Sequence, residues 1–339
     1  MKLAYSRFDL KLKHLFTISR SSRNDSPVII VEIEHDGVVG FGEAAPSGRY
    51  GESVETVEAF LAKLDLRRFE DPFQLESILD YVDGVAENGS SAKAAIDIAL
   101  HDWIGKRIGL PLHTYWGLDK QKTPLTSFTI GIDKPQVIEQ KVREAEEYPI
   151  LKIKLGGIND EEILRTVRRV TNKTLRVDAN EGWKTKETAL EKIKWLEQEG
   201  VEFVEQPMPA ADLAGTAWVR ERVNLPLIAD ENSMRLHDVP RLQGVFDGIN
   251  IKLMKCTGLR EALKMVHAAR ACGLKIMTGC MIESSVGISA AAQFSPLIDY
   301  ADLDGNVLTS NDPFDGVKII EGKLILPDRP GIGVVKRSD

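Results

Sequence analysis

Short apolar segments alternate with charged amphipathic segments from about residue 123 to residue 305, and this alternation constrains the fold of the 339-residue chain more than any other feature. Apolar strands separated by helical crossovers are typical of a parallel sheet with helices packed outside it. Helical patterns lie, for example, at residues 161–170, 186–199 and 259–271. Eight strands are predicted, near residues 125–131, 150–155, 174–179, 201–206, 226–230, 248–253, 275–279 and 300–303. The pattern predicts an α/β protein built on a modified TIM (β/α)8 barrel, of the (β/α)7β kind because the last helices are irregular.

The two ends of the chain follow other patterns. A β-branched run, a turn and an apolar return over residues 28–43 predict antiparallel strands, with helical patterns near residues 53–64, 74–83 and 90–105. Residues 317–326 read as a hairpin that could return to the N-terminal sheet. We therefore predict two domains: an α+β capping domain at residues 1–122, completed by residues 306–339, and a catalytic barrel at residues 123–305.

The charge balance argues against several classes of protein. Lys and Arg number 44 against 51 Asp and Glu, a net charge of −7, whereas nucleic-acid binding relies on basic patches, so no nucleic-acid partner is expected. The apolar stretches are too short to cross a bilayer, so no membrane partner is expected. Residues 1–9 carry charges where a signal peptide has its apolar core, and we expect a cytoplasmic protein. A homo-oligomer is possible.

Carboxylates end three successive predicted strands of the barrel. Asp178, Glu205 and Asp230 are 27 and 25 residues apart, about one strand–helix unit each, so they are expected side by side at the carboxyl ends of the strands. Any one of them alone is as easily a helix N-cap. Three clustered anions, however, repel one another unless a cation binds among them. Oxygen ligands without His or Cys favour Mg²⁺, and one such ion per active site is predicted.

Lysines lie on two other predicted strands. Lys152 and Lys154 point to the same side because the side-chain period of a strand is two, and Lys252 lies four strands further on, nearly opposite in an eight-strand ring. Strand-end lysines can simply extend their ammonium groups to water. Ammonium groups crowded near one another and near a metal instead have lowered pKa values, so that a neutral lysine can act as a base. Two lysines facing each other across a metal-bound substrate suit a reaction that removes a proton on one face and returns one on the other.

Asp302 and Asp304 follow the last predicted strand. Two acids two residues apart share a face and can bind a cation between them, although the following Gly305 and Asn306 also make this good turn chemistry. Together with these polar residues, a resemblance to a known family rests on segments 40–46 (GFGEAAP), 152–154 (KIK), 178–180 (DAN), 205–207 (EQP), 229–231 (ADE), 249–255 (INIKLMK) and 302–305 (DLDG).

On these segments, which span essentially the whole chain, the sequence resembles the enolase superfamily, in its muconate lactonising enzyme subgroup, and within it the dipeptide epimerases. The resemblance implies a metal site and two acid/base groups: Mg²⁺ on Asp178, Glu205 and Asp230, and proton transfer by Lys154 and Lys252. Lys152 would tune the pKa of its neighbour and help to hold the substrate carboxylate. In the dipeptide epimerases the DxD motif, here Asp302 and Asp304, binds the free α-ammonium of the N-terminal residue.

The implied reaction inverts the α-carbon of the C-terminal residue of a dipeptide by two-base 1,1-proton transfer through an enediolate. An L-Ala-D/L-Glu dipeptide from cell-wall peptide turnover, or a related dipeptide, is the first expectation. The alternatives within the subgroup are an N-acylamino-acid racemase, a muconate-type cycloisomerase and an o-succinylbenzoate synthase. A non-catalytic ligand-binding barrel is the alternative outside the enzymes.

Specificity for the second side chain is expected from loops at residues 14–26 and 46–53, which should close over the site. Arg20 and Arg23 lie in the first loop, and either could pair with a carboxylate such as that of glutamate, although an exposed loop arginine is more often solvated. Arg20 lies close to the position of the family's specificity arginine and is the predicted substrate-binding residue. Glu283, after the seventh strand, is a further site-lining candidate without an assigned role.

Overall fold

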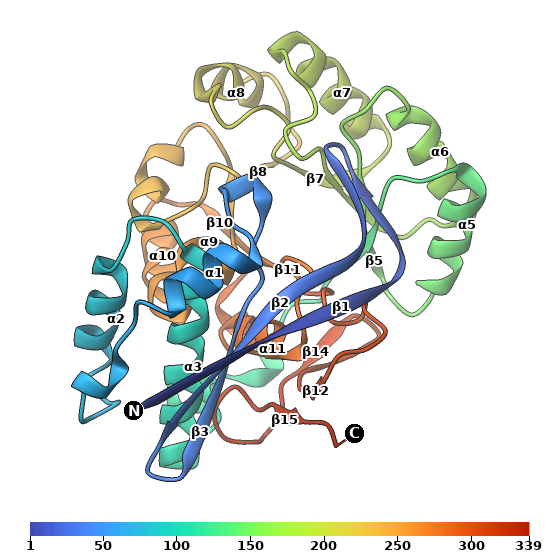
Figure 1. The fold of residues 1–339 in the computed structure, drawn as a ribbon. Helices are drawn as coiled ribbons and strands as arrows, with labels where there is room; N and C mark the ends of the chain where they lie inside the picture. Colours follow the sequence, from blue (N-terminus) through green and yellow to red (C-terminus); the bar gives the residue numbers. More distant parts are fainter. Residues whose placement is uncertain (339) are drawn as a thin grey trace.

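Three antiparallel strands form the N-terminal sheet of the computed structural model, which describes residues 1–338. They are ordered β1-β2-β3 and comprise β1 (Lys2–Ile18), β2 (Ser21–His35) and β3 (Val38–Ala44). Four helices follow, namely α1 (Val54–Leu61), α2 (Leu75–Gly84), α3 (Ser90–Ile108) and α4 (Leu112–Tyr115). Helix α3 can pack closely on β3 because Gly42 has no Cβ. A Cβ at this position would overlap the carbonyl oxygen of Ala95. The predicted α+β unit is therefore present at this end of the chain (Figure 1).

Eight parallel strands form the barrel, hydrogen-bonded in chain order from β4 to β11. They are β4 (Phe128–Ile130), β5 (Ile150–Lys154), β6 (Thr174–Asp178), β7 (Val201–Glu205), β8 (Leu227–Ala229), β9 (Gly248–Ile251), β10 (Lys275–Gly279) and β11 (Tyr300–Asp302). The first and last strands meet through Ser127, whose amide donates to the carbonyl oxygen of Ala301 at 3.1 Å. The predicted modified barrel is confirmed.

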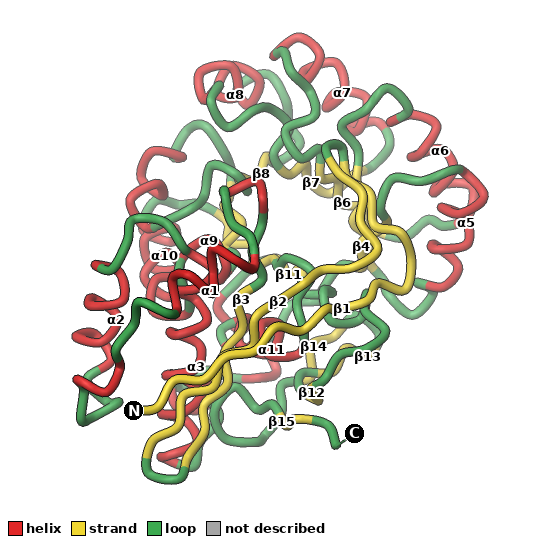
Figure 2. Tube along the Cα trace, in the orientation of Figure 1, coloured by secondary structure: helices red, strands yellow, loops and turns green. Residues whose placement is uncertain are grey.

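Helices surround the strands on the outside, as Figure 2 shows. They are α5 (Pro135–Glu144), α6 (Asp160–Val170), α7 (Lys186–Gln198), α8 (Leu213–Arg220), α9 (Leu253–Cys256), α10 (Leu259–Ala271) and α11 (Ser285–Gln293). The crossover after β8 holds a 3₁₀ helix, Leu236–Leu242, and Pro240 inside it explains why an α-helix does not form there. Irregular helices therefore occur in the crossover after the fifth barrel strand and again in the last crossover, where the 3₁₀ helix Ser295–Leu297 follows α11.

The C-terminal segment corrects one prediction. Strands β13 (Lys318–Ile320) and β14 (Lys323–Ile325) do form a hairpin, but it is a separate two-stranded sheet and does not join the N-terminal one. Lys323 bridges Leu125 instead, so the hairpin lies against the segment leading into the barrel.

The last residues return to the capping helices. Strand β15 (Val335–Lys336) pairs with β12 (Phe314–Asp315). Just before β15, the amide of Leu112 donates to the carbonyl of Gly331 at 3.0 Å, and the amide of Ile332 donates to Asp102 Oδ1 of α3 at 2.9 Å. The C-terminal segment therefore contacts the helices of the cap. Residues 308–311 also contact β1 of its sheet, where the Ser310 amide donates to the carbonyl of Lys11 at 2.8 Å.

Residues 14–26 are also not the loop that the sequence predicts. They form the distal end of the long β1–β2 hairpin, with the turn at residues 19–20, and the strand pairing shifts in register between Lys11 and Phe16. The hairpin reaches across the carboxyl end of the barrel, with its tip beside β6 and β7 (Figures 1 and 2). Strand pairing extends this segment far enough to cover the barrel mouth. Over the described residues, no helix is long and apolar enough to cross a membrane.

Candidate active site

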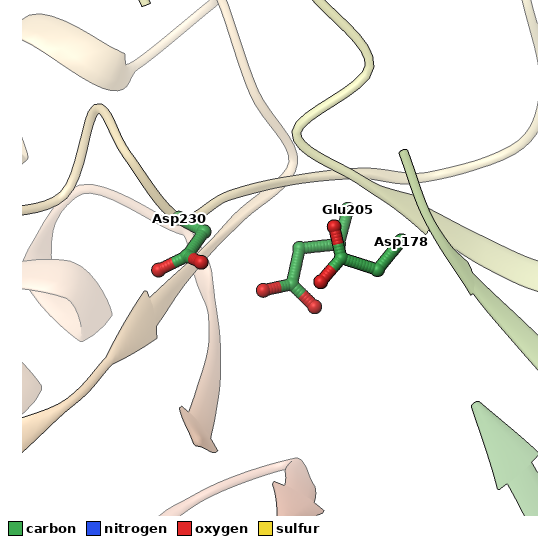
Figure 3. Close-up of side chains that lie close together, drawn as sticks. All are labelled: Asp178, Glu205 and Asp230. Carbon is green, nitrogen blue, oxygen red and sulfur yellow. The ribbon is translucent and has the colours of Figure 1, made fainter. Parts of the chain in front are cut away.

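Three buried carboxylates converge at the mouth of the barrel (Figure 3). Asp178 ends β6, Glu205 ends β7 and Asp230 directly follows β8, and one oxygen of each lies within 4.8 Å of the others. Adjacent parallel strands end at the same edge of a barrel, which is why side chains about one strand–helix unit apart meet here.

One oxygen of each carboxylate is held by a donor of the protein. The donors are the Asn180 amide for Asp178 Oδ1 (2.8 Å), the Asn250 side-chain amide for Glu205 Oε1 (2.7 Å) and the Lys255 ammonium for Asp230 Oδ1 (2.5 Å). The other oxygens face the lysines of the cavity. Lys154 lies 2.6 Å from Asp178 Oδ2, and Lys252 lies 2.8 Å from Asp230 Oδ2. The cluster therefore already attracts positive charge on the side that faces the cavity.

Lys152 is the most heavily paired of these lysines. Its Nζ lies 2.6 Å from both Glu205 Oε2 and Asp302 Oδ2 and 3.3 Å from Asp178 Oδ2. Burial lowers the pKa of Lys152, but the three carboxylates outweigh burial and raise it well above its ordinary value. Burial likewise lowers the pKa of Lys252, and Asp230 and Glu205 raise it well above that value. The carboxylates that contact these two lysines therefore affect their pKa values more than burial does.

The carboxylates themselves differ in pKa. Burial raises the pKa of Asp178, but Lys154 and Lys152 outweigh it and bring the value to about 2. The pKa of Asp230 is also well below its ordinary range, since Lys252 and Lys255 outweigh burial. Burial and the neighbouring Asp178 raise the pKa of Glu205 to about 7. Glu205 contacts one lysine whereas Asp178 and Asp230 each contact two, and it is the member of the triad that is most easily protonated.

The donor set fits a hard divalent cation. Each of the three residues offers a buried carboxylate oxygen, and oxygen-only ligands are those that Mg²⁺ prefers. Fixed hydrogen bonds to the second oxygen hold each carboxylate in orientation, as ligand-supporting groups do in metal sites. Asp178, Glu205 and Asp230 could therefore hold a metal ion.

Asp302 and Asp304 lie beside this cluster and line the same cavity. Asp302 accepts from Ser127 Oγ at 2.6 Å in addition to its ion pair with Lys152, which outweighs burial and lowers its pKa. Asp304 Oδ2 accepts from the Thr129 amide at 2.6 Å, while burial and Asp302 raise its pKa to about 6. The two acids thus form an anionic pocket next to the lysines.

The cavity has a volume of about 330 Å³ and lies between the barrel mouth and the capping domain. Its floor includes Lys152, Lys154 and Lys252, and its cover comes from the hairpin tip and from residues 46–50. The expectation that these two N-terminal segments lie over the site agrees with this placement. A cavity of this size is suited to a small molecule of dipeptide dimensions.

The two candidate arginines have different surroundings. Arg20 donates to Glu231 Oε1 at 2.6 Å and to the carbonyl of Asn180 at 3.0 Å, so its guanidinium is already paired with the barrel. Arg23 lines the cavity and forms no ion pair with any described residue, and burial lowers its pKa. Both arginines line the cavity, Arg20 with its guanidinium paired to the barrel and Arg23 without an ion-pair partner among the described residues.

Glu283 does not line the cavity, contrary to expectation. It is buried, its Oε1 accepts from the Met281 amide at 2.7 Å, and burial and Glu43 raise its pKa to about 8. Glu43 itself accepts from the Ser284 amide at 2.8 Å, which links the capping sheet to the start of α11. This placement favours a structural role for Glu283.

Other side chains at the site were not predicted. Glu181 accepts from Arg49 at 2.8 and 2.9 Å, joining the covering loop to the barrel just beyond a predicted metal ligand. Asn250 and Lys255 contact predicted ligands from behind. For Asn250 a signal existed in the sequence, since it precedes Lys252 by two residues and so shares its face of the strand.

The chain is similar to known proteins along its whole length. Residues 6–117 match the family model "Mandelate racemase / muconate lactonizing enzyme, N-terminal domain", and residues 136–339 match "Enolase C-terminal domain-like". The chain is 53% identical to the L-Ala-D/L-Glu epimerase of Bacteroides thetaiotaomicron, over 99% of this chain and 88% of that one.

Solved structures give the same result. A substrate-liganded L-Ala-D/L-Glu epimerase from Bacillus subtilis superposes with a TM-score of 0.94 at 30% identity, covering 100% of this chain and 99% of that one. A dipeptide epimerase from Enterococcus faecalis, in complex with Mg and L-Leu-L-Tyr, has a TM-score of 0.89 at 36% identity, covering 98% of both chains. The protein therefore belongs to the mandelate racemase/muconate lactonizing enzyme family of the enolase superfamily.

Proposed function

We propose that this protein is a Mg²⁺-dependent dipeptide epimerase that inverts the α-carbon of the C-terminal residue. The observation that carries the proposal is the content of one cavity: Lys154 and Lys252 come from strands four apart in the barrel, with a buried carboxylate triad and a second acidic pair beside them. The names of the similar epimerases support the dipeptide as substrate class.

Each group has a distinct task in this reaction. Asp178, Glu205 and Asp230 would hold Mg²⁺, which supplies positive charge to stabilise the negative charge that develops on the substrate carboxylate. Lys152 lies against the triad and adds a second positive charge there. Asp302 and Asp304 bind the ammonium of the N-terminal residue, which fixes the dipeptide lengthwise in the cavity.

Lys154 and Lys252 then move the proton. One lysine, as the free amine, takes the α-proton from one face of the carbon, and the other, as the ammonium, delivers a proton to the opposite face. The roles exchange in the reverse direction. Capping by the hairpin and residues 46–50 limits access of water to the cavity, which strengthens these charge interactions.

An N-acylamino-acid racemase or cycloisomerase is less compatible with the cavity, because such substrates carry no α-ammonium to pair with Asp302 and Asp304. A dipeptide library incubated with enzyme and Mg²⁺ in D₂O, followed by mass spectrometry, tests the assignment. Free-amine dipeptides are expected to gain one α-deuterium. Exchange in N-acylated amino acids but in no free-amine dipeptide would contradict it.

Replacing Asp304 by asparagine should weaken recognition of the ammonium. We expect kcat/KM for free-amine dipeptides to fall about 10–100-fold, because a charge-assisted hydrogen bond contributes about 1.5–3 kcal/mol. In the unmodified enzyme, the carboxyl with a pKa of about 6 loses its charge as the pH falls through that value, so ammonium binding weakens below it. D304N should lack this pH-dependent step, and retention of the step would assign it to another group.

For the second side chain we propose an acidic residue, bound by Arg23. Arg23→Ala is expected to lower kcat/KM for Ala-Glu about 10–100-fold, because a charge-assisted contact is lost, and to leave Ala-Ala nearly unchanged. Steady-state kinetics with both substrates measures the selectivity. Arg20→Ala is the matched comparison: a selective loss in R20A but not in R23A would assign the side-chain carboxylate to Arg20. A role in cell-wall peptide turnover would follow from this preference.

A further inference from the structure

Asn250 lies behind the carboxylate triad rather than in the cavity. It belongs to β9, is fully buried and does not line the cavity, yet its Nδ2 donates to Glu205 Oε1 at 2.7 Å. Strand β8 separates β9 from β7 in the sheet, so this hydrogen bond crosses the barrel interior. A neutral amide at this position orients Glu205 without adding charge to the cluster.

Gly279 provides the room for this amide. It ends β10, the strand beside β9, and a Cβ built on it would lie 2.8 Å from both Nδ2 and Oδ1 of Asn250, closer than real side-chain contacts. The backbone of Asn250 is fixed as well, because its carbonyl accepts from Lys255 Nζ at 3.1 Å. That same ammonium holds Asp230, so one short segment of chain contacts two members of the triad.

We propose that Asn250 is a positioning residue for the metal site, that it acts through Glu205, and that Gly279 is required for it to do so. The inference rests on the proposed metal site but adds residues to which no role has been given. Removing a group that orients a metal ligand typically lowers metal affinity or activity by about 10–100-fold. If the Asn250 amide had only a structural role in the barrel interior, its removal would lower the stability of the fold but leave the affinity for the metal ion unchanged.

A double-mutant cycle on the full-length protein tests this coupling, with Mn²⁺ affinity measured by electron paramagnetic resonance of the free ion. Mn²⁺ is a suitable probe because it takes the same oxygen ligands as Mg²⁺. We expect Asn250→Ala to weaken Mn²⁺ binding about 10–100-fold and Gly279→Ala to weaken it in the same direction. In the N250A background the Cβ at residue 279 no longer meets an amide, so G279A should change affinity by less than about twofold there.

The control is Asn311→Ala, which removes a side-chain amide that is bonded to Lys11 and Asp9 and does not line the cavity, and it should leave Mn²⁺ affinity unchanged. Circular dichroism checks folding, and Asn250→Ser replaces N250A if the latter does not fold, since serine is too short to reach Glu205. Unchanged affinity in N250A, or additive effects in the double variant, would overturn the inference. Absence of Mn²⁺ binding in the unmodified protein would instead overturn the proposed metal site together with it.

Discussion

Replacing Lys154 or Lys252 by alanine is expected to lower the turnover number for epimerisation by about 10²–10⁴-fold or more, because general acid–base catalysis contributes about that much and each turnover requires both lysines. The two side chains reach the same cavity from β5 and from the end of β9. Neither variant can both remove and return the proton. The rate of change in optical rotation, or chiral chromatography of the hydrolysed product, measures the loss.

The same variants separate the two faces of the reaction. In D₂O each should still exchange the α-proton of one epimer, the one whose proton faces the remaining lysine, and should not exchange that of the other. Lys106→Ala is the control, since Lys106 pairs with Asp102 in the capping domain and lies outside the cavity. Near-normal epimerisation in either active-site variant, with the control unaffected, would contradict the two-base assignment.

Removing a carboxylate of the triad is the second change that is expected to lower activity strongly. We expect Asp178→Asn to lower kcat about 10³-fold or more, because a bound metal ion supplies several kcal/mol to the transition state. The variant should also lose measurable affinity for Mn²⁺. Chelation of the unmodified enzyme with EDTA should abolish activity, and added Mg²⁺ should restore it.

Glu202→Gln is a matched control for this change. Glu202 lies on β7 three residues before Glu205, but it pairs with Arg176 at 2.7 Å, away from the cavity. Loss of the Glu202 charge should leave kcat and metal affinity close to those of the unmodified enzyme. Full activity of D178N after exhaustive chelation would show that the reaction does not depend on the triad.

The parts of the site that the sequence predicts are those that strand geometry determines. Carboxylates at the ends of successive parallel strands must meet, so Asp178, Glu205 and Asp230 are brought together as their spacing requires. Asp302 and Asp304 share a face because the side-chain period of an extended chain is two, and both line the cavity. These inferences need only local structure and strand order.

Features that depend on packing between distant segments could not be predicted in this way. The hairpin tip places Arg20 against Glu231, a residue 211 positions away, and no local pattern signals that contact. The space beside Gly279 for the amide of Asn250 exists only because β9 and β10 pair in one particular register. The C-terminal hairpin contacts the segment before β4 for the same kind of reason.

The direction of the lysine pKa shifts could not be predicted from the sequence either. Crowding of ammonium groups suggests lowered pKa values, but the count of carboxylates in contact decides the direction. Lys152 alone has three carboxylates within 3.3 Å. A bound divalent cation would offset part of that negative charge, so the state of the lysines depends on the occupancy of the triad.

The central claim is that two lysines exchange the α-proton of a dipeptide held beside a metal ion. Proton NMR of L-Ala-L-Glu, incubated with the enzyme and Mg²⁺ in D₂O, tests this most directly. We predict loss of the glutamate α-proton signal together with appearance of the L-Ala-D-Glu resonances, and neither change after chelation of the metal. An intact α-proton signal in L-Ala-L-Glu and in all other dipeptides tried, with Mg²⁺ bound, would contradict the account.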